Sequence, residues 1–187
     1  MKTEQRLLRV FLIIGSATGW FAIVTQFYLI ISNSSLPAFS VAVNFFSYFT
    51  ILTNIIVALC FTVLLAGQES SLGKFFSQPK ILTAIAVYIS IVGIVYNVIL
   101  RFIWDPQGLQ RVVDELLHSV IPILFVLFWL IFVPKKVLSW GDAFSWLIYP
   151  IIYSGYILVR GIYSGLYPYP FIDVNELGYS KVLLNTS

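Results

Sequence analysis

Charged residues are scarce in this 187-residue chain. Only 10% of its residues are Asp, Glu, Lys or Arg, 59% are hydrophobic, and the mean hydropathy is +0.93. A soluble globular domain carries about 25% charged residues, and a soluble chain of this size has too little interior to bury so much apolar surface. These proportions exclude a soluble enzyme, a disordered region and a nucleic-acid-binding module. They predict an integral membrane protein surrounded by membrane lipids.

Cysteine and histidine are each present only once. Cys60 alone excludes an intrachain disulfide and a cysteine-based metal site. His118 alone argues against a histidine-rich metal or haem centre, and the apolar segments contain no lysine that would form a retinal Schiff base. The sequence therefore predicts neither a metal ion nor an organic cofactor.

Five apolar segments are long enough to cross a bilayer, which takes about 20 helical residues. Turn-forming residues separate them, as in residues 33–37 (NSSLP) and 105–108 (DPQG). Only helices and closed barrels satisfy backbone polar groups in lipid, and these runs lack the alternation of strands. We predict an all-α polytopic transmembrane helical bundle, forming one domain over residues 1–187. The expected spans are residues 8–32, 41–66, 81–103, 112–133 and 143–163.

The two ends of the chain raise separate questions. The first segment has the basic start of a signal peptide and the small residues Ala17 and Gly19, but its apolar run exceeds the usual ~7–15 residues. We expect an uncleaved helix. Residues 164–187 predict an outer loop and the start of a further helix, so we expect a sixth span to be missing at the C-terminus.

Basic residues are unevenly distributed between the loops. Seven of them fall on the side of the N-terminus, which the positive-inside rule places in the cytoplasm. They are Lys2, Arg6, Arg9, Lys74, Lys80, Lys135 and Lys136.

Polar residues inside the expected spans are the natural place to look for function, because they are costly in lipid. In the second span, Ser47, Thr50 and Asn54 share a helix face. The third span adds Tyr96, Asn97 and Arg101, and the fourth carries Asp114, Glu115 and His118 on one face. At about 1.5 Å per residue, Thr50 lies roughly 13 Å below the outer start of its helix. By the same rise, Asn97 and His118 lie roughly 9 Å deep, so these side chains can meet if their helices are neighbours.

A hydroxyl beside the one imidazole suggests nucleophilic catalysis. Threonine needs a base to accept its proton, and His118 is suited to that role. Asp114 or Glu115 would orient the imidazole ring. The candidate donors to an oxyanion are Asn54, Asn97 and Tyr96.

Three non-catalytic interpretations remain open. Serine and threonine often bond to their own helix, and polar residues hold helices together. Asp114 and Glu115 are also suited to a solvated helix start. The chain would then be a membrane scaffold or a lipid-binding protein. A transporter is the third alternative and is less favoured, because no carboxylate lies near the middle of the membrane.

Three short motifs together resemble a known family. They are residues 47–54 (SYFTILTN), 116–122 (LLHSVIP) and 167–173 (YPYPFID). In this order and spacing they resemble the FAR-17a / androgen-induced-protein-like family of six-helix membrane proteins, over about residues 41–184. The uncharacterised bacterial branch is the most similar, which implies a bacterial plasma membrane.

The resemblance implies an activity. Animal members are intramembrane threonine hydrolases that cleave fatty-acid esters of hydroxy fatty acids with one threonine and one histidine. The resemblance places these residues at Thr50 and His118, with Thr53 as the alternative to Thr50. It thus implies a lipid ester as substrate, while protein partners stay open.

Overall fold

The computed structural model describes residues 2–186, and all regular elements in that part of the chain are helical. Within it, five helical segments are long and apolar enough to cross a membrane, which confirms the predicted all-α class. These segments are Lys2–Asn33, Phe49–Ala66, Pro79–Phe102, Gly108–Phe132 and Asp142–Ser164. The chain divides between Ser139 and Trp140 into two compact units. Each unit is described by itself below.

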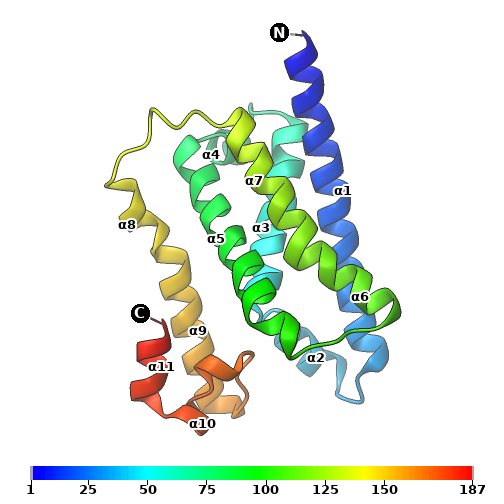
Figure 1. Ribbon diagram of the computed structural model, residues 1–187, viewed down its shortest axis with the longest axis vertical. Helices are drawn as coiled ribbons and strands as arrows, with labels where there is room; N and C mark the ends of the chain where they lie inside the picture. The colour runs from blue at the N-terminus through cyan, green and yellow to red at the C-terminus, as the bar shows by residue number, and fades with distance from the viewer. Residues whose placement is uncertain (1, 187) are drawn as a thin grey trace. The chain divides into compact units, whose positions relative to one another are not determined.

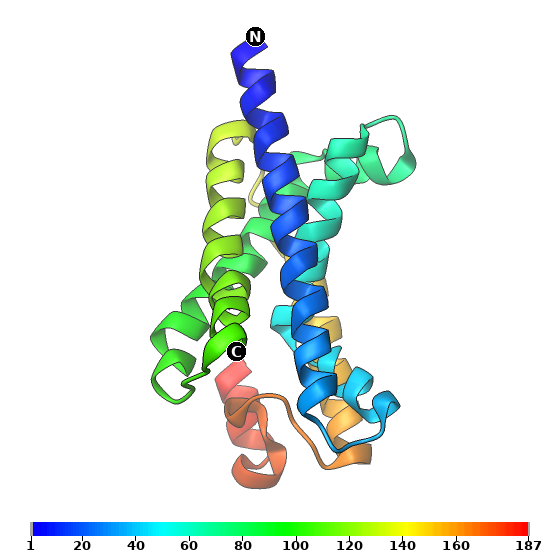
Figure 2. The same cartoon turned by 90° about the vertical axis from the view of Figure 1, so that its right-hand side faces the viewer.

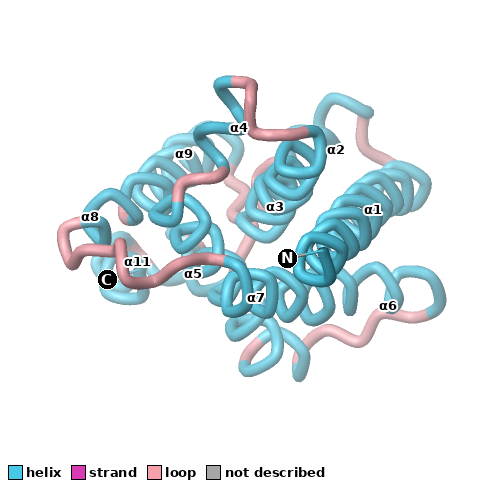
Figure 3. Tube along the Cα trace, turned by 90° about the horizontal axis from the view of Figure 1, so that it is seen from above, coloured by secondary structure: helices cyan, strands magenta, loops and turns pink. Residues whose placement is uncertain are grey.

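The first unit is built on four long helices that lie side by side (Figure 1). Each contacts two of the others, in the cyclic order α1, α3, α5, α7, and Figure 3 looks down this arrangement. The helices are α1 (Lys2–Asn33), α2 (Ala38–Phe45), α3 (Phe49–Ala66), α4 (Ser71–Phe76), α5 (Pro79–Val98), α6 (Gly108–Glu115) and α7 (Ile121–Phe132). A 3-10 turn, η1 (Leu100–Phe102), follows α5, and a π-helical turn, η2 (Leu116–Val120), joins α6 to α7. Figure 2 shows α6 and α7 alongside α1.

Aromatic packing fills the middle of this unit. Phe61 of α3 lies against Phe125 and Phe128 of α7, with ring centroids 5.2 and 5.3 Å apart. All three side chains are buried. In lipid, such close packing is a main source of attraction between helices, because the surrounding tails are equally apolar.

Helices α1 and α3 approach closely through small residues. Gly15 faces the ring of Phe61, and a Cβ atom added at Gly19 would lie 2.9 Å from the Cβ of Ala58. One turn further along α3, Thr62 Oγ1 accepts a hydrogen bond from Trp20 Nε1 at 3.0 Å. The Gly-x-x-x-Gly spacing of residues 15–19 is typical of such helix contacts.

The expected span over residues 41–66 is two helices, α2 and α3, instead of one. The chain turns at residues 46–48, where Tyr48 adopts an extended conformation and Ser47 Oγ donates back to Val43 O at 2.6 Å. Thr50 is therefore the second residue of α3, so the depth counted along a continuous helix does not apply. Ser47 lies outside α3, and only Thr50 and Asn54 keep the expected common face.

The second unit holds α8 (Asp142–Trp146), α9 (Ile148–Ser164), the 3-10 turn η3 (Pro170–Ile172), α10 (Val174–Leu177) and α11 (Tyr179–Thr186). Gly165 ends α9 in the left-handed conformation, with φ of 67°. The chain then folds back so that Tyr167 lies directly on Gly161. Residues expected as an outer loop with a helix start thus form three short helical elements, and α11 contacts both α10 and η3.

Candidate active site around His118

The π-helical turn η2 carries His118 and leaves two backbone carbonyl groups without their usual partners. The N–H of Ile121 bonds to Leu116 O, five residues back, and so does not reach Leu117 O. Pro122 has no N–H to offer to His118 O, four residues before it. Single π-helical turns inside α-helices frequently occur at functional sites.

Two asparagines from neighbouring helices supply the missing donors. Asn54 Nδ2 on α3 bonds to Leu117 O at 3.1 Å and to Thr50 O at 2.9 Å. Asn97 Nδ2 on α5 bonds to His118 O at 3.2 Å and to Gly93 O at 2.8 Å. Both hydrogens of each amide are therefore in use. Asn54 thus joins the turn of Thr50 to the turn of His118.

The imidazole of His118 is held by Asp114, four residues earlier. His118 Nδ1 lies 2.9 Å from Asp114 O and 3.4 Å from Asp114 Oδ1. A backbone carbonyl oxygen only accepts, so Nδ1 carries the hydrogen in this contact. The side chain of His118 is 13% exposed and that of Asp114 is 8% exposed. Of the two carboxylates predicted to orient the ring, Asp114 is therefore the one in contact with it.

Tyr96 covers the same imidazole from α5. Its ring stacks on that of His118, with centroids 4.1 Å apart and planes 15° apart. Its hydroxyl donates to Asp114 Oδ2. Tyr96 therefore contacts both the histidine and the residue that holds the histidine.

Glu115 points to Arg101 instead. The guanidinium and carboxylate make two contacts, Nη1 to Oε1 at 2.6 Å and Nη2 to Oε2 at 2.7 Å. Ser119 Oγ adds a bond to Glu115 Oε2 at 2.9 Å, and Arg101 Nε donates to Asn97 Oδ1 at 3.0 Å. Asn97 therefore links the ion pair to the turn of His118.

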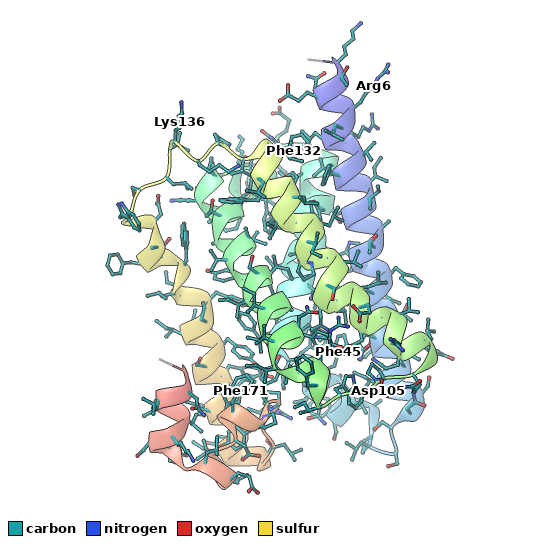
Figure 4. All side chains as sticks on the ribbon, viewed as in Figure 1. Arg6, Phe45, Asp105, Phe132, Lys136 and Phe171 are labelled. Carbon is teal, nitrogen blue, oxygen red and sulfur yellow. The ribbon has the colours of Figure 1, made fainter. Side chains whose placement is uncertain are left out.

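These residues lie toward one end of the first unit. In Figure 4, Phe45 and Asp105 mark that end, while Arg6 and Phe132 lie toward the other. Arg101 and Glu115 are about one-third exposed, whereas Asn54, Thr53 and Thr50 are buried. Within residues 2–186, no group of three or more His, Cys, Asp or Glu side chains is placed to hold a metal ion.

The expected oxyanion donors have other acceptors in this structure. The amides of Asn54 and Asn97 bind backbone carbonyls, and the Tyr96 hydroxyl binds Asp114. The two amides complete the backbone around η2, a role that the sequence does not reveal directly. Pro122, four residues after His118, was the available signal, because a proline always leaves the carbonyl four residues earlier without that donor.

Comparisons with known proteins add no further constraint on this site. No protein-family model, no curated protein and no solved structure matches the chain. The resemblance to the androgen-induced-protein-like family therefore stays a prediction based on the three motifs.

Proposed function

We propose that this chain is an intramembrane hydrolase that cleaves a fatty-acid ester, with Thr50 as nucleophile and His118 as base. One observation carries the proposal. The imidazole donates from Nδ1 to Asp114 O, on a turn that Asn54 joins to the turn of Thr50. A neutral histidine with a basic Nε2 is the form that activates a hydroxyl.

The reaction has two halves. Thr50 Oγ1 attacks the ester carbonyl while its proton passes to His118 Nε2, and the imidazolium then protonates the departing alkoxide. A water molecule hydrolyses the acyl-threonine by the same proton transfers in reverse order. The carboxylate of Asp114, 3.4 Å from Nδ1, stabilises the imidazolium at each stage.

The arrangement of basic residues supports a cytoplasmic N-terminus, and the family resemblance supports a bacterial plasma membrane. Figure 4 places Arg6 and Lys136 at one end of the first unit, away from Asp105. By the positive-inside rule the end with Arg6 faces the cytoplasm. The site then lies in the outer half of the membrane, where an ester in the outer leaflet reaches it.

A non-enzymatic scaffold or lipid-binding protein is the second candidate. It is favoured by the way Asn54 and Asn97 each bind two backbone carbonyls, and by the pairing of Arg101 with Glu115. Polar residues that only join helices show the same kinds of bond.

Labelling with a fluorophosphonate probe separates the two candidates. The purified chain in detergent is compared with Thr50→Val, Thr53→Val and His118→Gln, and with Thr62→Val as a matched loss of a hydroxyl elsewhere on α3. We expect labelling to disappear with Thr50→Val and His118→Gln and to persist in the other two. Absence of labelling in folded wild-type protein, or labelling that survives Thr50→Val, contradicts the hydrolase and favours the scaffold.

A further inference from the structure

Three separate elements meet at the ring of His118. Tyr96 belongs to α5, Asp114 to α6 and His118 to η2. The bond from Nδ1 to Asp114 O fixes one atom of the imidazole but leaves the ring free to tilt about that contact. The nearly parallel Tyr96 ring removes this freedom, because an imidazole stacked at 4.1 Å keeps its plane.

The Tyr96 hydroxyl has a distinct role from the Tyr96 ring. Tyr96 is 4% exposed, and a buried hydroxyl or carboxylate is costly without a partner. The bond from Tyr96 to Asp114 Oδ2 satisfies both groups at once. A phenylalanine would keep the stack but would leave this buried oxygen of Asp114 without its donor, so that Asp114 and its carbonyl oxygen would no longer be held in place beside Nδ1.

We propose that Tyr96 is a positioning residue for His118. Its ring fixes the imidazole plane, and its hydroxyl holds Asp114 so that Nδ1 stays protonated and Nε2 stays free. The contact of Nδ1 with Asp114 O stands on the geometry alone, whereas the contribution to catalysis rests on the proposed hydrolase. Arg101, 5.2 Å from the centre of the Tyr96 ring, packs on the same tyrosine and is neutralised by Glu115.

The tautomer can be observed directly because His118 is the one histidine in the chain. Protein labelled with 15N-histidine gives the nitrogen signals of a single imidazole. In wild-type protein in detergent at about pH 8.5, where an ordinary histidine is neutral, we expect a protonated Nδ1 and a bare Nε2. In Tyr96→Phe we expect the chemical shifts of the two nitrogens to move toward each other, because both tautomers become populated. In Tyr96→Leu, which also removes the stacked ring, we expect these shifts to move further.

Tyr88→Phe is the matched control, because Tyr88 is also buried on α5, eight residues before Tyr96. It should leave both nitrogen signals unchanged. A wild-type spectrum with a protonated Nε2, or spectra of Tyr96→Phe and Tyr96→Leu identical to wild type, would overturn the inference. Loss of the wild-type tautomer in Tyr88→Phe would overturn it too, since the effect would then not be specific to Tyr96.

Turnover of a fatty-acid ester tests the catalytic part. Residues that orient metal-binding histidines typically contribute about 10- to 100-fold, and by analogy we expect kcat to fall about 10-fold in Tyr96→Phe with KM unchanged. A rise in KM as large as the fall in kcat would instead indicate that Tyr96 contacts the substrate. Should the chain show no hydrolase activity while the wild-type and Tyr96 spectra behave as expected, the hydrolase proposal fails and the positioning of His118 stands.

Discussion

Two polar clusters lie within the first unit, and they are built differently. The cluster between α1 and α3 consists of Ser16, Trp20 and Thr62, all neutral. Thr62 also donates to Ala58 O on its own helix at 2.7 Å. The cluster around His118 combines an imidazole, two carboxylates and a guanidinium, and draws on α3, α5, η1, α6 and η2.

The difference shows which intramembrane polar groups only hold helices together. Around Thr62 the helices are regular, so the side chains add bonds to a backbone that is already satisfied. Around His118 the backbone itself depends on Asn54 and Asn97. Ionisable groups in lipid are costly, and a site that needs residues from several elements to accommodate them is the better candidate for chemistry.

The largest effect on stability is expected for Asn54→Leu. Leu117 O would lose its buried donor, and an unsatisfied buried group costs about 1–3 kcal/mol. We therefore expect the free energy of unfolding in detergent to fall by about 3 kcal/mol. The matched control is Asn33→Leu, because Asn33 is exposed and bonds only to Leu29 O. Equal losses in both variants would show that η2 does not depend on Asn54.

Gly19→Ala tests the close approach of α1 to α3. The new Cβ would lie 2.9 Å from the Cβ of Ala58, so the helices must shift apart. Overpacking of this kind costs about 1–3 kcal/mol, measured as a lower midpoint of thermal unfolding. Gly155→Ala, where the added Cβ meets nothing within 4 Å, should leave the midpoint the same or raise it. A stable Gly19→Ala protein would contradict the packing described for these helices.

Thr62→Val removes the shared hydroxyl of the neutral cluster. Interhelical hydrogen bonds in membranes average about 0.6 kcal/mol, so we expect a loss of about 1 kcal/mol and full fluorophosphonate labelling. Thr50→Val should instead lose the labelling. Loss of labelling in Thr62→Val would remove the distinction between the two clusters.

Glu115→Gln should have the smallest effect. The pair with Arg101 is about one-third exposed, and such surface pairs contribute about 0–1 kcal/mol. We expect a loss below about 0.5 kcal/mol, with the bond to Ser119 kept by the new amide. Unfolding at two salt concentrations checks this, since the small loss should vanish at high salt. A loss larger than that of Thr62→Val would show that the ion pair is a main support of η2.

Hydropathy predicted the five spans because it reports which residues lie in lipid. It carries no information on whether the backbone is continuous, so it missed the turn between Phe45 and Phe49 and the π-helical turn. The pairing of Thr50 with Asn54 survived because their separation of four residues holds within α3. Ser47 was grouped with them only because we assumed an unbroken helix.

Contacts between elements were harder to predict. The sequence left open which carboxylate contacts His118, and it gave Arg101 no partner, because both depend on how α5 packs against η2. The spacing of Gly15 and Gly19 did contain a packing signal. From the sequence alone, however, Gly19 is equally typical of the small residues in a cleavable leader.

The π-helical turn also sets the rotational phase of the span that contains it. One extra residue in a helical turn rotates everything before it by about 100° relative to an unbroken α-helix. Deleting a residue from η2 would restore regular geometry but would rotate the face of α6 that carries Asp114 away from its present neighbours. A single span can thereby present an apolar α7 to the core and a polar α6 to α1, where Gln110 bonds to Gln26 at 2.8 Å.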